Sequence, residues 1–146
     1  MTKLAEYIRS KREDHTLLAS DAAKMKEEWL RQLDDLMADI DRWLEPAVGE
    51  GLTVTKGTTE LIEGGLGTYR VPMRTIEVAG NQVTIVPVAR IIVGGHGRVD
   101  VKNQRATAYL IFWKPEDRWL IVRERDWERR EPLTEESFER LMEAFL

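Results

Sequence analysis

Two patterns of apolar residues divide the chain into a helical beginning and a sheet-forming remainder. From Thr2 to Leu44 the sequence has neither glycine nor proline, and apolar side chains recur every three or four residues. This spacing is typical of an amphipathic helix with one buried face. Pro46 and Gly49 then end the helical pattern. The stripe is formed by Leu18, Ala22, Met25, Trp29, Leu33, Leu36, Ile40 and Trp43.

The upstream part of this helix is less regular. Leu4 and Ile8 continue the apolar stripe, but the polar residues Lys11 and His15 occupy its next positions. We therefore expect a break or kink between residues 10 and 20. Three residues in that region are of the type that commonly caps a helix N-terminus: Ser10, Thr16 and Ser20.

After residue 50 the apolar residues alternate with polar ones, and turn-forming residues follow at short intervals. Alternation of this kind is typical of half-buried strands. Turns this short cannot hold a crossover helix, so neighbouring strands are expected to pair antiparallel as a meander. The predicted strands are 51–55, 58–63, 67–78, 82–93, 97–102, 106–113 and 118–125.

The two longest predicted strands each contain a proline, Pro72 and Pro87. A two-residue turn at 80–81 would place Pro72 opposite Ala89 and Pro87 opposite Arg74. Because proline has no N–H to donate to a sheet, we expect a shared bend or edge at this level.

A second helix is predicted at the end of the chain. Thr134 is a suitable N-cap, and the two glutamates after it favour a helix N-terminus. The sequence thus predicts one α+β domain over residues 1–146. Its parts are a helical segment over 1–46, an antiparallel sheet of six or seven strands over 51–125, and a helix over 134–146.

The length of the first helix limits how it can be covered. A compact domain of 146 residues has a radius of gyration of about 15 Å, and hence a diameter of about 38 Å. A helix over residues 2–44 would be about 65 Å long, and residues 20–44 alone would span about 37 Å. Either the first dozen residues fold back as a short helix, or part of the stripe is buried against another chain.

Composition narrows the class of protein. The chain has no cysteine, which excludes disulfides, thiolate nucleophiles and cysteine-based metal sites. Its uninterrupted apolar runs are a few residues long, whereas a membrane-spanning helix needs about 20. We expect a soluble cytoplasmic protein that does not enter membranes. No metal or cofactor site is predicted.

The segment GGHGRVDVK, residues 94–102, is the main candidate for chemistry. Its glycines would let backbone amides approach an anion, and Arg98 and Lys102 would add positive charge. His96, at the tip of the predicted loop, is a further candidate residue for binding an anion or nucleic acid. The glycine spacing fits neither phosphate-binding pattern, G-x-x-x-x-G-K-[ST] nor G-x-G-x-x-G. A glycine-rich hairpin loop is the interpretation we favour.

The strand GRVDV also resembles the strand that carries the first aspartate of the PD-(D/E)xK nucleases, here Asp100. The resemblance implies a metal-dependent nuclease whose second carboxylate and lysine lie on the next strand. In that strand, IFWK, Phe112 stands where the carboxylate is required, and Lys114 follows it. Since one carboxylate is too few for the metal, this alternative is a nucleic-acid-binding or degenerate nuclease-related protein centred on Arg98, Asp100, Lys102 and Lys114.

The leading hypothesis is a small non-enzymatic interaction or accessory protein, because no complete catalytic set can be assembled from the sequence. The first helix would serve self-association as a homodimer, or docking on a protein partner. Trp127 is a further candidate because its neighbours in RERDWERRE are almost all charged. The predicted partner-binding residues are Trp29, Leu36, Ile40, Trp43 and Trp127.

Overall fold

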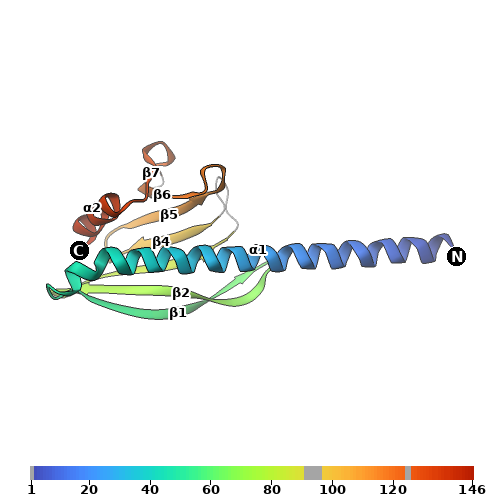
Figure 1. The fold of residues 1–146 in the computed structure, drawn as a ribbon, viewed down its shortest axis with the longest axis horizontal. Helices are drawn as coiled ribbons and strands as arrows, with labels where there is room; N and C mark the ends of the chain where they lie inside the picture. The colour runs from blue at the N-terminus through green and yellow to red at the C-terminus, as the bar shows by residue number, and fades with distance from the viewer. Residues whose placement is uncertain (1, 91–96, 124–125) are drawn as a thin grey trace.

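The structure, a computed structural model, describes residues 2–90, 97–123 and 126–146, and only the backbone at residues 17–19. It confirms the α+β prediction: a long N-terminal helix, an antiparallel sheet and a C-terminal helix (Figure 1). The helices are α1 (Lys3–Val48) and α2 (Glu135–Phe145), with short 3-10 turns η1 (Lys114–Glu116) and η2 (Trp127–Arg129). The strands are β1 (Thr53–Glu63), β2 (Gly67–Val78), β3 (Asn81–Ala89), β4 (Arg98–Lys102), β5 (Thr107–Trp113), β6 (Arg118–Arg123) and β7 (Glu131–Pro132).

Helix α1 is one continuous helix of 46 residues, about 69 Å long at 1.5 Å per residue. The predicted break between residues 10 and 20 was wrong. Lys11 and His15 interrupt the apolar stripe, but their side chains do not disturb the backbone hydrogen bonds of a helix. The N-cap is Thr2, whose hydroxyl accepts a hydrogen bond from the Ala5 N–H at 3.2 Å. Pro46 lies inside the last turn.

The sheet has the order β1-β2-β3-β4-β5-β6-β7, with each strand antiparallel to the next, as predicted for a meander. Two strand predictions were wrong. Residues 56–57 form no turn. The two strands predicted at 51–55 and 58–63 are instead one continuous strand, β1. The short strand β7 was not predicted, and two residues carry too little alternation to be recognised.

The predicted register of the β2–β3 hairpin was wrong by two residues. Val78 pairs with Asn81, so the turn is formed by residues 79–80, which both have positive φ as a type I′ turn requires. Counted from the turn, the last β2–β3 pair is Arg74 with Ile85. Pro72 and Pro87 lie two residues farther from the turn on their two strands. The two prolines therefore lie at the same level, and pairing stops before a position where neither strand has an N–H.

Beyond the prolines the sheet divides around α1. In Figure 1, β1 and β2 run below the helix while β4, β5 and β6 lie above it. The arm formed by β1 and β2 is tied to the end of β3 through Glu63, which accepts hydrogen bonds from the Tyr69 hydroxyl at 2.5 Å and from the Arg90 N–H at 2.9 Å. Burial and the neighbouring Glu63 carboxylate raise the pKa of Tyr69.

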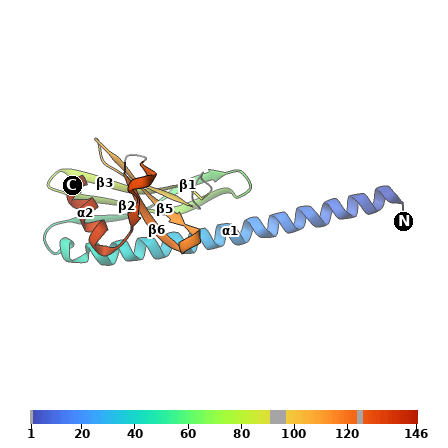
Figure 2. The same ribbon diagram turned by 90° about the horizontal axis from the view of Figure 1, so that it is seen from above.

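The hydrophobic core lies between this curved sheet and the second half of α1. Large α1 side chains from Trp29 to Leu44 are buried there, together with Val83 and Ile85 of β3 and Phe138 of α2. The first half of α1 extends beyond the sheet, which both views show (Figures 1 and 2). The sheet thus covers only part of the helix.

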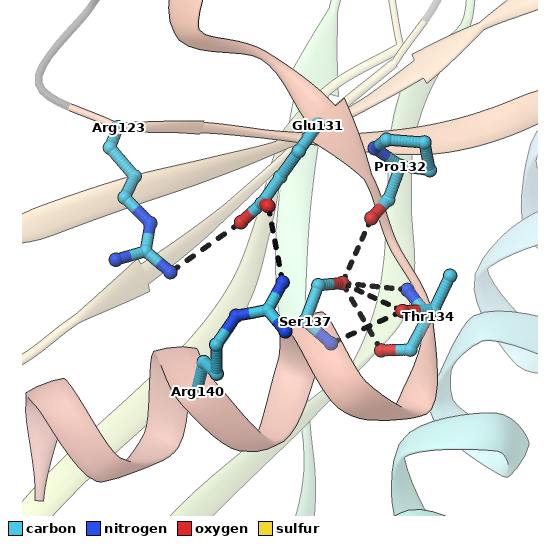
Figure 3. A network of polar contacts seen from close by, with 6 residues as sticks. All are labelled: Arg123, Glu131, Pro132, Thr134, Ser137 and Arg140. Atoms are coloured by element: carbon cyan, nitrogen blue, oxygen red, sulfur yellow. Dashed lines mark hydrogen bonds and ion pairs between the residues drawn. The ribbon is translucent and has the colours of Figure 1, made fainter.

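Polar contacts at its start attach α2 to the sheet (Figure 3). Thr134 is the N-cap, as predicted, and its hydroxyl accepts a hydrogen bond from the Ser137 N–H at 3.1 Å. The Ser137 hydroxyl donates to the Pro132 carbonyl at 2.8 Å. Glu131 lies 3.6 Å from Arg123 and 3.3 Å from Arg140, which joins β7 to β6 and to α2.

Candidate protein-interaction surface

The part of α1 that extends beyond the sheet exposes apolar side chains. We call residues 3–16 the projecting segment; every side chain in it is exposed except Ala5, which is half-buried. Leu4 is 66% exposed, Tyr7 60% and Ile8 48%. Water-exposed apolar groups on one side of a helix favour burial against another surface.

These side chains lie in line with the stripe that packs on the sheet. Leu4, Ile8, Lys11 and His15 follow one another at intervals of four, three and four residues, the spacing of a coiled-coil seam. The same alternation leads to Trp29, whose side chain is 1% exposed. One face of α1 is therefore covered by the sheet at one end and uncovered at the other.

Three of the predicted partner-binding residues lie in the core of the same chain. Trp29, Leu36 and Ile40 are at most 1% exposed, because the curved sheet and α2 cover α1 over this stretch. Trp43 is half-buried, with its ring 5.5 Å from that of Phe138. The part of α1 that exposes apolar side chains is thus the projecting segment, upstream of these residues.

Trp127 lies in η2 and is half-buried. Its ring packs edge-on against Trp113 at 5.4 Å, and the guanidinium of Arg130 lies 5.1 Å from the ring centre. A tryptophan in a charged sequence is here covered by one aromatic neighbour and one arginine. Part of its ring remains accessible.

Arg98 and Asp100, central to the alternative interpretation, are paired with each other. The Arg98 guanidinium donates to both carboxylate oxygens of Asp100, at 2.7 and 3.0 Å. It also lies 4.6 Å from the centre of the Tyr109 ring. Hydrogen bonding to Asp100 raises the pKa of Arg98. The guanidinium of Arg98, whose side chain is 32% exposed, is therefore already paired with a buried carboxylate of the same strand.

The other residues of that interpretation are not brought together. Lys102, at the end of β4, pairs with Thr107, whereas Lys114 follows the opposite end of β5. Lys102 instead lines a polar groove of about 630 Å³, which also contains Glu77 and Arg105. Phe112 is buried against Trp119. His96 lies outside the described residues.

The described residues contain no group of three or more histidine, aspartate or glutamate side chains placed to hold a metal ion. Among the helices described, none is long and apolar enough to cross a membrane. No family model, curated protein or solved structure matches the chain. The projecting segment is the candidate site because it exposes Leu4, Tyr7 and Ile8.

Two features of the structure were not recognised in the sequence. One is the exposed edge of β1, which was hidden because the strand was predicted as two short ones. The other is Gly97, where an added Cβ would lie 2.4 Å from the ring of Trp29. The glycine-rich segment thus contains a position required for packing against α1. A glycine at the start of a predicted strand was the sequence signal for such a close approach.

Proposed function

We propose that this protein is a non-enzymatic interaction protein that uses the projecting segment of α1 to dock on a helix of a partner protein. The observation that carries the proposal is the exposure of Leu4 and Ile8 on the same helix face that is buried farther along. A short helix without tertiary contacts is only marginally stable in water. Docking would bury its apolar side chains and stabilise it.

The charges along the seam favour a partner different from this chain. In a parallel pair of identical helices, Lys11 would face Lys11 and His15 would face His15 in successive layers. In an antiparallel pair that sets Leu4 against Ala22, Lys11 would face His15. Both arrangements bring basic groups together inside the seam. A partner helix with apolar residues facing Leu4 and Ile8 and a carboxylate facing Lys11 avoids this.

Designed peptides test this chemistry directly. A labelled peptide of three leucine-isoleucine heptads with glutamate at the seam position facing Lys11 is titrated with the full-length chain, and its fluorescence anisotropy is measured. A matched peptide has lysine at that position. We expect at least tenfold tighter binding of the acidic peptide. We also expect its affinity to fall as salt is raised, since the new ion pair is screened.

Variants of the full-length chain locate the contact. Ile8→Glu is expected to remove binding of the acidic peptide, because it places a charge on the apolar face of the projecting segment. Ser10→Glu, on the opposite side of the helix, is the matched control and should bind normally. Equal affinity for both peptides, or unchanged binding by Ile8→Glu, would overturn the proposal. So would the failure of both peptides to bind.

A further inference from the structure

Strand β1 forms one edge of the sheet. Within the described residues it pairs with β2 along all of its 11 residues, and no strand lies on its other side. The outward N–H and C=O groups of such an edge can form hydrogen bonds with another extended chain. In Figure 1, β1 lies at the outer side of the molecule.

The two edges of the sheet differ in how they are protected. Proteins commonly block an edge with a short strand, a proline, a bulge or an exposed lysine. At the opposite edge, β7 has two residues, one of which is Pro132. Strand β1 is long, has no proline, and pairs with β2 without a register shift. Lys56 is the one lysine on this edge.

The exposed side chains of β1 complement a second copy of the same strand. We propose that β1 pairs antiparallel with β1 of another molecule of this chain, about a two-fold axis at Thr58. In that register Lys56 of each copy faces Glu60 of the other. Val54, which is half-buried against the core, faces Ile62, which at 79% exposure is the most exposed large apolar side chain among the described residues. Each of these contacts occurs twice, as two-fold symmetry requires.

Neighbouring registers lack this complementarity. An axis at Lys56 would set the two lysines against each other, and an axis at Glu60 would do the same for the two glutamates. An axis at residue 57 would place Val54 opposite Glu60, and an axis at residue 59 would place Ile62 opposite Lys56. Opposite charges that face each other across strands stabilise a sheet, while like charges destabilise it. The axis at Thr58 is therefore favoured.

Both charged side chains are available for this contact. Lys56 is 71% exposed and lies 3.5 Å from Asp41, which keeps its two hydrogen bonds from Arg74 if Lys56 turns outward. Glu60 is exposed. Its cross-strand neighbour Arg70 donates two hydrogen bonds to the Thr58 hydroxyl, at 2.8 and 3.2 Å. Lys56, which otherwise protects the edge, becomes a specific contact in the dimer.

The dimer would present two projecting segments. Helix α1 runs along β1 in the opposite direction (Figure 1), so antiparallel pairing of the two β1 strands directs the segments toward opposite ends. This inference does not depend on the proposed function, because it uses a different surface. A dimer with two separated docking helices would bind a divalent partner more tightly than one copy.

The oligomeric state of the full-length chain tests the inference. Sedimentation equilibrium is expected to give a dimer, twice the chain mass of 16.9 kDa. Lys56→Glu alone and Glu60→Lys alone should each give monomers, since each places like charges opposite each other. An equimolar mixture of the two variants should regain the dimer, because both cross-strand pairs then have opposite charges. Loss of stability at either site would not produce this recovery.

Controls separate β1 from the other surfaces. Lys102→Glu, on β4, should leave the dimer intact, and so should Ile8→Glu in the projecting segment. Circular dichroism checks that each variant is folded. A monomeric wild-type chain at about 100 μM would overturn the inference, as would a Lys56→Glu dimer as tight as the wild type. Dissociation by Ile8→Glu would also overturn it, since the dimer would then be formed through α1.

Discussion

Arg74 on β2 donates two hydrogen bonds to the carboxylate of Asp41 on α1, from Nε at 2.8 Å and from Nη2 at 3.1 Å. The Arg74 side chain is 9% exposed and that of Asp41 is 25% exposed. A third hydrogen bond runs from Arg74 to the Met73 carbonyl at 2.9 Å. A charge this deeply buried requires a partner of opposite charge. The pair therefore fixes the helix to the sheet at one defined position.

Removal of the Asp41 charge is expected to destabilise the protein strongly. Asp41→Asn leaves the Arg74 guanidinium buried without a counter-charge, so the free energy of unfolding should fall by about 2–3 kcal/mol. Urea denaturation followed by circular dichroism measures the change. Asp39→Asn is the matched control, since Asp39 is 45% exposed and pairs with Arg42 on the surface. Its effect should stay below about 0.5 kcal/mol; equal losses in the two variants would contradict the assigned role.

The same pair predicts a dependence of stability on pH. Burial raises the pKa of Asp41, but the hydrogen bonds and charge of Arg74 and the charge of Lys56 outweigh it, so the pKa lies below its usual value of 3.8. A group with a lowered folded-state pKa stabilises the protein above its unfolded pKa. This contribution is lost as the pH falls from 3.8 through the folded-state pKa.

Denaturation of the wild type and of Asp41→Asn between pH 7 and pH 2 measures this contribution. The difference in unfolding free energy between the two should be constant above about pH 5 and should shrink below pH 4. A difference that persists unchanged to pH 2 would mean that the Asp41 carboxylate is not what stabilises the folded state.

The periodic parts of the fold were predictable from the sequence. The apolar stripe of α1 repeats over many turns, and α2 begins at a recognisable N-cap. The alternation of apolar and polar residues identified most of the strands. The errors came from single residues that also permit another structure. Gly57 permits a turn, yet β2 supplies a partner for Lys56, Gly57 and every residue around them, and β1 continues through. Tertiary pairing overrode a weak local preference.

The position of the exposed surface on α1 could not be predicted in the same way. The sequence gives the apolar face of a helix but not which part of it a sheet will cover, because that depends on the curvature of the sheet. Here the sheet divides at Pro72 and Pro87 and covers α1 from Trp29 onward. Trp29 was therefore predicted as a partner contact and is in the core. The comparison of helix length with domain size predicted surplus apolar surface, but not its location.

Gly97 is predicted to be intolerant of a side chain. A Cβ at this position would lie 2.4 Å from one atom of the Trp29 ring and 2.9 Å from another, and this ring is enclosed by the core. Gly97→Ala should therefore lower the unfolding free energy by about 1–3 kcal/mol, as overpacking of a core does. Gly64→Ala is the control, because no atom lies within 4 Å of the added Cβ there. Thermal denaturation distinguishes the two; equal midpoints would show that Trp29 can move away.

The two halves of α1 should respond differently to the same substitution. Leu36 is 1% exposed in the core and Leu4 is 66% exposed on the projecting segment. Leu36→Ala should lower the unfolding free energy by about 2–5 kcal/mol, since it removes buried contacts and leaves a cavity. Leu4→Ala should change it by less than about 0.5 kcal/mol, because the side chain already contacts water in the isolated molecule.

Hydrogen exchange resolves the same difference along the helix. Amides of residues 33–44 should exchange only through global unfolding, whereas those of residues 4–16 should exchange through local opening. If β1 pairing alone forms the dimer, this contrast is the same in dimer and monomer. Protection of residues 4–16 that rises with protein concentration would instead show that the projecting segment binds a second copy. That result would shift the partner of α1 from another protein to the chain itself.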